Sequence, residues 1–375
     1  MNKPLITVRN LSVHYRLRGS LFGPRPILKA VDNVDLEVRR GGFFGLVGES
    51  GSGKTTLGRA LLKATDITSG EAVFNDGEVE YDLTTLNGPH LKDYRKRAQL
   101  IFQDPYASLS PRMTVRDIIA EPLEVLGLTK SRDETNQRVR EIAAKCRLNL
   151  EHLRRFPHAF SGGQRQRIAI ARALVSSPRF VVADESVAAL DVSIQADVLN
   201  LLQGIQRDTG ISFLFISHDL SVVAHVCDHV AVMYLGRLVE TAPTRKLFSN
   251  PRHPYTSALL SAIPSLDPDD RGDAQKLEGE IPSPTNPPSG CAFHTRCRFV
   301  RDRCRAEVPM LRDLGDGAKA ACHFAEEFDF IGPAPEKPAA RRPVRAKTPA
   351  KRAAVAKTRK PASSTGSKNV RRKSR

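Results

Sequence analysis

The sequence predicts an α/β fold that also carries a small antiparallel β subdomain, an inserted helical subdomain and an irregular C-terminal region. Three short apolar runs, residues 42–47, 179–185 and 211–218, are typical of buried parallel strands. A helical pattern at 55–64 follows the first run, and a glycine-rich stretch lies between the two. These observations place a sharp loop between a buried strand and a helix.

The glycine-rich loop reads GESGSGKTT and fits the pattern G-x-x-x-x-G-K-[ST] at every fixed position. Glycines let the backbone curl so that successive N–H groups point inward, where phosphate oxygens can approach closely. The start of the helix adds a partial positive charge. We expect Lys54 to reach the β- and γ-phosphates of a nucleotide and the Thr55 hydroxyl to bind Mg²⁺. The predicted nucleotide site comprises Gly48, Glu49, Ser50, Gly51, Ser52, Gly53, Lys54, Thr55 and Thr56.

The other elements follow in chain order. Residues 5–15, 30–38 and 70–83 alternate apolar and polar side chains roughly as strands of a small sheet do. A strand ending at Gln103 comes next, and helical patterns then run from Val115 to about Phe156. We interpret the stretch of about 104–175 as a helical insert.

A second anion site is predicted at the start of the helix 164–174. Ser161 is a natural N-cap, and the glycines after it leave backbone N–H groups uncovered. The sequence therefore predicts that an anion binds at Ser161, Gly162, Gly163 and Gln164, apart from the first loop.

Polar residues end three of the predicted strands. Asp184 can hold Mg²⁺ through water, and Glu185 beside it can orient or deprotonate an attacking water. Gln103 and His218 could both face the γ-phosphate. We therefore take Glu185, His218 and Gln103 as candidate catalytic residues, and Thr55, Gln103 and Asp184 as candidate Mg²⁺ ligands.

Length and composition limit the class of protein. The 375 residues allow one large domain with an appendage, or two domains. No run of eighteen apolar residues and no apolar signal core is present, so we expect a cytosolic chain. Residues 333–375 hold fifteen Lys and Arg and one acidic residue, which accounts for +14 of the net charge of +17. This tail is expected to be disordered, and it either touches nucleic acid or anionic lipid or is a solvated extension.

The chain resembles the ATP-binding subunits of ABC transporters through an ordered series of motifs: Gly48–Thr56, Gln103, Ser161–Gln164, Val181–Glu185, Ala189–Asp191 and His218. The resemblance spans about residues 4–325. It is closest to the dipeptide/oligopeptide importer branch, and there to the subunit labelled F, through stretches such as QDPYASLSPRMTV and PSPTNPPSGCAFHTRC. It implies a P-loop NTPase fold of ABC type that hydrolyses ATP with Mg²⁺.

The resemblance also implies how the two anion sites work together. In such subunits two ATPase domains sandwich two ATPs head to tail, so Ser161–Gln164 would face a nucleotide held by the partner. Asp191 is assigned to the nucleotide site by the same resemblance. An aromatic ring upstream of the loop would stack on adenine; we choose Tyr15, with Phe22 in reserve. The alternative is that Tyr15 is an ordinary strand aromatic.

Three positions depart from the family pattern. Phe160 stands where leucine is common, Ser186 where proline is usual, and Ala188 where serine is usual. The loop after Glu185 is therefore expected to be looser, but no charged or metal-binding group is lost. The catalytic set is complete.

Four cysteines cluster in the Pro-rich C-terminal region: Cys291, Cys297, Cys304 and Cys322. Their spacing lacks the C-x₂-C knuckle of zinc ribbons, whereas four thiolates suit a [4Fe–4S] cluster. Importers of the branch carry a similar set. Zinc and free thiols stay open as alternatives, and any metal site is expected to be structural. Cys146 and Cys227 are expected in the core.

We expect an ABC ATP-binding domain at 1–264, an extension with the four cysteines at 265–330 and the basic tail at 331–375. The implied function is ATP hydrolysis that energises import of di- or oligopeptides at the cytoplasmic face of the inner membrane. The implied partners are a second, unlike ATPase subunit, two transmembrane permease subunits and a solute-binding protein.

Other functions remain open at this point. Related importers carry nickel, sugars or glutathione. A soluble ABC ATPase that acts on the ribosome or on nucleic acid would suit the basic tail, and a redox-sensing ATPase would suit the cysteines. A single cassette argues against the translation type, and the short insert argues against a long coiled coil of the repair type.

Overall fold

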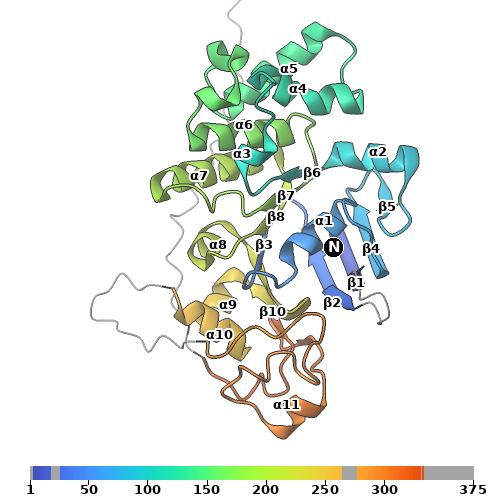
Figure 1. Cartoon of the computed structure of the whole chain (residues 1–375), viewed down its shortest axis with the longest axis vertical. Coiled ribbons are helices and arrows are strands. Elements are labelled where there is room, and N and C mark those ends of the chain that lie inside the picture. The colour runs from blue at the N-terminus through green and yellow to red at the C-terminus, as the bar shows by residue number, and fades with distance from the viewer. Residues whose placement is uncertain (1–2, 18–25, 264–276, 331, 333–375) are drawn as a thin grey trace, which may run out of the picture. The chain divides into compact units, whose positions relative to one another are not determined.

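The computed structural model describes residues 3–17, 26–263, 277–330 and 332 (Figure 1). They fall within one compact unit, Met1–Glu336. The expectations for the basic tail and for Phe22 lie outside the described residues.

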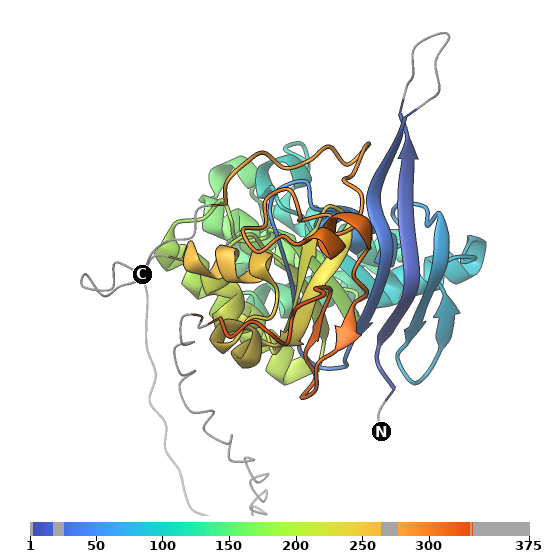
Figure 2. The same cartoon turned by 90° about the horizontal axis from the view of Figure 1, so that it is seen from below.

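A four-stranded antiparallel sheet in the order β2-β1-β4-β5 stands at one side of this unit (Figure 2). Val8 of β1 lies opposite Leu36 of β2 and Ala72 of β4, and all three side chains are buried. This confirms the predicted antiparallel β subdomain. Its strands are β1 (Ile6–Arg16), β2 (Ile27–Val38), β4 (Ser69–Asn75) and β5 (Glu80–Asp82).

The main sheet is mixed, and in the described part of the chain its order is β11-β12-β10-β9-β3-β8-β7-β6. The five strands from β9 to β6 run parallel, and they include the three predicted at 42–47, 179–185 and 211–218, whereas β10, β12 and β11 pair antiparallel. The strands are β3 (Phe43–Val47), β6 (Ala98–Ile101), β7 (Phe180–Asp184), β8 (Ser212–Ile216), β9 (His229–Tyr234), β10 (Arg237–Pro243), β11 (Arg312–Asp313) and β12 (Lys319–Ala320).

Strands β3, β7 and β8 are buried at every position because both faces of the sheet are covered. In β3, Phe43 and Val47 pack into a core shared with the helices α4 to α8. Phe44 and Leu46, on the opposite face, pack into a core shared with α1 and the antiparallel sheet. The loop after β3 therefore begins at the end of a strand whose two faces are both packed against the core.

The helices, in chain order, are α1 (Lys54–Leu61), α2 (Gly88–Arg97), α3 (Pro105–Ser108), α4 (Val115–Leu126), α5 (Arg132–Lys145), η1 (Leu150–Arg154), η2 (Pro157–Ala159), α6 (Gly162–Leu174), α7 (Val192–Thr209), α8 (Leu220–Val226), α9 (Thr244–Ser249), α10 (Pro254–Ser261) and α11 (Asp302–Ala306). Helices α3 to α6 lie between β6 and β7 in the chain and gather at one end of Figure 1. The side chains of Thr114 and Ser131 cap α4 and α5.

Two strand ends differ from the sequence-based expectation. Strand β6 ends at Ile101 rather than at Gln103, and β8 ends at Ile216 rather than at His218. The pairing with β7 ends where Ile101 lies opposite Ala183 and where Ile216 lies opposite Asp184. Gln103 and His218 therefore lie in loops just past the sheet.

The cysteine-bearing region is largely irregular, as predicted, but it also adds to the main sheet. Ala320 of β12 lies opposite Glu240 of β10. Ala320, Cys322, Ala325 and Phe328 form a small core of their own. The region is thus attached to the ATPase fold by a strand pairing that the sequence pattern did not indicate.

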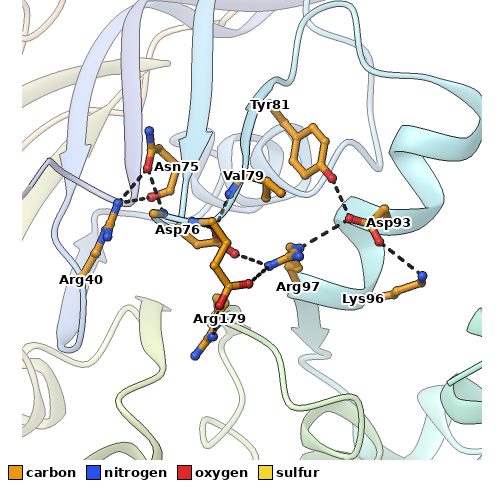
Figure 3. A network of polar contacts seen from close by, with 11 residues as sticks. Arg40, Asn75, Asp76, Val79, Tyr81, Asp93, Lys96, Arg97 and Arg179 are labelled. Carbon is orange, nitrogen blue, oxygen red and sulfur yellow. Dashed lines mark hydrogen bonds and ion pairs between the residues drawn. The ribbon is translucent and has the colours of Figure 1, made fainter. Parts of the chain in front are cut away.

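A network of ion pairs joins the β4–β5 turn to α2 and to the start of β7 (Figure 3). The Asp76 carboxylate is buried and accepts hydrogen bonds from the backbone N–H groups of Glu78 and Val79. Arg97 donates to Asp76 at 2.6 Å and to Glu78 at 3.0 Å, and Arg179 reaches Glu78 at 2.9 Å. These contacts connect the antiparallel sheet to the parallel one.

Candidate nucleotide site

The loop from Gly48 to Gly53 has a backbone that only glycine allows at two points. Gly48 has φ +147° and Gly53 has φ +104°. A Cβ on Gly48 would lie 2.1 Å from the Met233 carbonyl oxygen, and one on Gly53 would lie 2.1 Å from the Ala30 carbonyl oxygen. The loop is thus closely packed against β9 and β2, which fixes its curl.

Lys54, the first residue of α1, points back into the loop. Its ammonium donates to the carbonyl oxygens of Gly48 and Glu49, both at 2.8 Å, and to the Ser52 hydroxyl at 3.3 Å. Burial lowers the pKa of Lys54, and the carboxylates of Glu185 and Asp184 oppose that effect. A buried cation beside a curled backbone can bind the phosphates of a nucleotide.

Thr55 and Asp184 meet next to this loop. The Thr55 hydroxyl donates to Asp184 Oδ1 at 3.0 Å. Burial raises the pKa of Asp184, and the hydrogen bond from Thr55 opposes part of that rise. A hydroxyl and a buried carboxylate side by side are oxygen ligands of the kind Mg²⁺ prefers, so the residues present fit this ion.

Glu185 is held between Gln103 and His218. Gln103 Nε2 donates to Glu185 Oε2 at 2.7 Å, and His218 Nδ1 lies 3.4 Å from Glu185 Oε1. Glu185 has φ +44°, which is uncommon for a residue with a side chain. The structure thus brings together the three candidate catalytic residues, immediately after the Mg²⁺ candidate Asp184. A carboxylate in this place can orient or deprotonate a water aimed at a γ-phosphate.

The residue after Glu185 is one of the departures from the family pattern. Ser186 is 2% exposed, and its hydroxyl has no hydrogen-bond partner in the described residues. A buried hydroxyl without a partner costs stability.

The predicted second anion site lies at the start of α6. Ser161 caps this helix, and its backbone N–H donates in turn to Gln164 Oε1 at 3.1 Å, which completes a capping box. A Cβ on Gly163 would lie 2.4 Å from Ile194 Cγ2, so close packing on α7 requires glycine here. Within the described residues, no hydrogen bond joins this site to the loop Gly48–Thr56.

Two further residues that were predicted to contact the nucleotide form no hydrogen bond with the loop Gly48–Thr56 among the described residues. Tyr15 is 37% exposed, and its hydroxyl lies 3.0 Å from the Thr65 hydroxyl, just after α1. Asp191 is exposed at the N-cap position of α7, where its side chain makes no capping hydrogen bond.

The four C-terminal cysteines are brought together. Their side chains line one small cavity of about 10 Å³, together with rings such as Phe293, Phe299 and Phe324. Burial raises the pKa of three of these thiols, those of Cys291, Cys297 and Cys322, to about 11. In the described part of the chain, no three His, Cys, Asp or Glu side chains approach as ligands of a single metal ion would.

Cys146 and Cys227 are buried in the core, as predicted.

Two residues at the loop were missed by the sequence reasoning. Arg296 forms a bidentate ion pair with Glu49, and the Tyr255 hydroxyl accepts a hydrogen bond from the Glu49 N–H. The cysteine-bearing region therefore reaches the phosphate loop, a contact that the sequence did not indicate. The one available signal was an acidic residue inside an anion-binding loop, which calls for a nearby cation.

Comparison with known proteins agrees with this geometry. A family model described as "ABC transporter" matches residues 31–188, and one described as "Oligopeptide/dipeptide transporter, C-terminal region" matches residues 239–304. A Brucella ovis protein that carries a peptide-import ATP-binding designation is 51% identical over 85% of this chain and 97% of its own length. The dipeptide transport ATP-binding protein DppF of Escherichia coli K12 is 47% identical over 88% of this chain and 96% of its own length.

The solved structures show the same fold. The ATP-binding cassette MJ0796, a dimer in a post-hydrolysis state with ADP and Pi, superimposes with a TM-score of 0.56 at 26% identity. The match covers 64% of this chain and 99% of that one.

The fold and the site therefore define an ABC-type ATPase, a nucleotide-driven motor domain. Within that class, the chain belongs to the ATP-binding subunits of the oligopeptide/dipeptide ABC transporter family. It hydrolyses ATP to drive transport. No helix in the described residues is long and apolar enough to cross a membrane.

Proposed function

We propose that this chain is the ATP-hydrolysing subunit of an importer for di- or oligopeptides, bound to the cytoplasmic face of the cell membrane. The observation that carries the proposal is the cluster of polar side chains at the end of the sheet. There Glu185, next to Asp184, accepts a hydrogen bond from Gln103 and faces His218. The peptide substrate is supported by the names of the relatives and by the match over residues 239–304.

The residues have separate tasks in this proposal. Lys54 and the loop N–H groups would bind the phosphates, while Thr55 and Asp184 would hold Mg²⁺, which would supply positive charge to offset that of the phosphates. Glu185 takes the proton of the attacking water. Gln103 and His218 keep the Glu185 carboxylate in place.

A second ATPase subunit completes the site. The start of α6 is the predicted second anion site, yet Ser161–Gln164 makes no hydrogen bond to this chain's own loop among the described residues. MJ0796, which has the same fold, is a dimer with ADP and Pi bound. We therefore assign Ser161–Gln164 to a nucleotide held by the partner subunit, and Asp191 to the same interface. Tyr15 remains our choice for the adenine contact.

A transmembrane partner would dock in a groove of about 400 Å³ between β6 and the helices α4 and α6. Its lining includes Phe102 and Val125, which are 42% and 66% exposed. Phe102 precedes Gln103, which donates to Glu185. A permease segment in this groove would thus contact the residue next to Gln103, the hydrogen-bond donor to Glu185.

The cysteines Cys291, Cys297, Cys304 and Cys322 are proposed to hold a [4Fe–4S] cluster. Four thiols around one cavity are the usual donor set of such a cluster. Within the described residues, no three such side chains are grouped as ligands of a single metal ion, which a zinc site would need. The cluster would cross-link an irregular region that has only a small core of its own.

The proposal is tested by isolating the chain with the membrane proteins that copurify with it. We expect permease subunits and a second ATPase subunit, and an ATPase rate that rises when a peptide-loaded binding protein is added. Val125→Arg should abolish copurification but leave ATP binding unchanged. Met310→Arg, at a position that is 72% exposed in the cysteine-bearing region, is the matched control. Isolation of ribosomal proteins instead of permeases would overturn the proposal.

A further inference from the structure

A residue of the cysteine-bearing region forms an ion pair with the phosphate loop. Arg296 Nη1 lies 2.7 Å from Glu49 Oε2, and Arg296 Nη2 lies 3.2 Å from Glu49 Oε1. The Arg296 side chain is only 4% exposed, and that of Glu49 is 25% exposed. A bidentate pair shielded from water is stronger and more directional than a surface ion pair. The two partners are 247 positions apart in the chain.

The backbone of Glu49 is fixed as well. Its N–H donates to the Tyr255 hydroxyl at 2.9 Å, and Tyr255 is fully buried. The Tyr255 ring packs against Tyr234 at 4.7 Å and against Phe293 at 5.3 Å between ring centroids. Phe293 belongs to the same turn as Arg296. The first residue after Gly48 is therefore held at its side chain and at its backbone by one aromatic and ionic cluster.

Arg296 is placed by the turn between Cys291 and Cys297. The Arg296 N–H donates to the Phe293 carbonyl at 3.0 Å, and the His294 N–H donates to the Cys291 carbonyl at 2.9 Å. The turn is short and closed by these hydrogen bonds. The guanidinium that pairs with Glu49 is thus carried by a short turn that begins and ends at a cysteine.

The charge of Glu49 makes its ion pair with Arg296 relevant to nucleotide binding. A carboxylate within an anion-binding loop repels incoming phosphates unless a cation neutralises it. Lys54 also donates to the Glu49 carbonyl oxygen, so a shift of Glu49 would move an acceptor of the lysine that is expected to bind phosphate.

We propose that Arg296 is a positioning residue for the phosphate loop and that it couples the turn 291–297 to the affinity for Mg-ATP. This inference rests on the nucleotide site proposed above. By linkage, bound Mg-ATP stabilises the turn by the same free energy that an intact turn adds to nucleotide binding.

The test compares Arg296→Ala with Arg298→Ala in the full chain. Arg298 flanks Cys297 on the other side, is exposed and lies over the Phe299 ring at 4.7 Å. Both variants remove one positive charge, Arg296→Ala from the turn 291–297 and Arg298→Ala from the residue that follows it. In a titration with a fluorescent ATP analogue and Mg²⁺, Arg296→Ala should weaken binding roughly tenfold, a typical coupling between two sites. Arg298→Ala should bind within about twofold of the wild type.

The steady-state parameters separate positioning from general damage. Arg296→Ala should raise KM for ATP far more than it lowers kcat, because Glu185, Gln103 and His218 lie on other elements. Arg296→Lys should recover part of the affinity, since a lysine keeps the charge but not the bidentate geometry. The double variant with Glu49→Ala should bind no more weakly than Arg296→Ala alone, because Arg296 is argued to act through Glu49.

Hydrogen exchange tests the reciprocal effect. Mg-ATP should slow exchange in residues 291–297 of the wild type and of Arg298→Ala, but not of Arg296→Ala. Wild-type affinity in Arg296→Ala, equal losses in the two arginine variants, or a fall in kcat at constant KM would each overturn the inference. If the wild-type chain binds no nucleotide, or if Lys54→Ala binds as tightly as the wild type, the proposed site itself fails and the inference falls with it.

Discussion

At the scale of single residues, the site is a set of charged groups. Each is in a buried position or a backbone conformation that would be energetically unfavourable on its own. Lys54 is buried among carbonyl oxygens, Asp184 is buried beside Thr55, and Glu185 has a positive φ. Such arrangements persist only when the surrounding structure over-determines them. Here the surrounding structure is the parallel sheet, whose strands β3 and β7 are buried throughout.

Glu185→Gln tests the role of the carboxylate as base. The amide keeps the size of the side chain but cannot accept a proton, so ATP hydrolysis should fall by about 10²–10⁴-fold while ATP binding persists. The rate is measured as phosphate release by the purified complex, with Glu141→Gln on the exposed face of α5 as the control. Wild-type turnover in Glu185→Gln would remove Glu185 from the mechanism.

Ser186→Ala tests whether the hydroxyl next to Glu185, which has no hydrogen-bond partner in the described residues, destabilises the folded state. The Ser186 hydroxyl is buried without a hydrogen bond in the described residues. Its removal should leave the free energy of unfolding unchanged or raise it by about 1 kcal/mol. Denaturant unfolding measures this, with Ser131→Ala, which removes a helix cap, as the destabilised reference. A loss of about 1 kcal/mol or more in Ser186→Ala would show that the hydroxyl has a partner after all.

At the scale of elements, much could be predicted from local pattern. The apolar runs identified β3, β7 and β8, and the capping residue Ser161 identified the start of α6, because burial and capping leave local signatures. The two-residue strands β11 and β12 left no such signature, since they exist only through pairing with β10.

The start of α6 carries a prediction that involves two chains. Ser161→Arg places a large cation where a partner's nucleotide should lie, so it should abolish hydrolysis at that nucleotide and preserve ATP binding at this chain's own loop. Ser131→Arg is the matched control, because Ser131 also caps a helix with its side chain, that of α5. Nucleotide titration and phosphate release are measured on the assembled complex. Loss of this chain's own ATP binding in Ser161→Arg would contradict the head-to-tail arrangement.

The junction of β3, β9 and β10 predicts a pH dependence of stability. His229 stacks on Phe44 and bonds to Thr241, and burial, with Arg39 and Lys319 nearby, lowers its pKa from 6.5 to about 4. The folded state thus resists protonation that the unfolded chain accepts below pH 6.5. This contribution is complete above pH 6.5 and is lost as the pH falls towards 4.

His229→Gln should flatten that dependence. For the wild type the contribution of His229 has a slope of up to about 1.4 kcal/mol per pH unit in the free energy of unfolding. Denaturant unfolding at several pH values between 4 and 7 measures the slope in both proteins. Equal slopes would mean that His229 titrates normally in the folded state.

At the scale of the whole molecule, the sequence indicated the candidate catalytic residues but not their mutual contacts. Gln103 and Glu185 are 82 positions apart, and Glu49 and Arg296 are 247 apart. For the first pair, the sequence indicated only that both residues come at the ends of predicted strands, and not that they touch. The second pair could not be predicted, because no periodic pattern connects an irregular, Pro-rich region to a loop so distant in the chain.

The central claim is that ATP bound at the loop Gly48–Thr56 energises peptide import. The most direct measurement is ATP-dependent uptake of a labelled dipeptide by vesicles that contain the full complex with its ATPase subunits facing the interior. The complex carries either the wild-type chain or Lys54→Ala. Loss of the Lys54 ammonium removes the cation that is expected to bind the β- and γ-phosphates. Uptake should require ATP and should fall to the level without ATP in Lys54→Ala, with assembly of the complex unchanged. ATP-driven uptake at the wild-type rate in Lys54→Ala would contradict the claim.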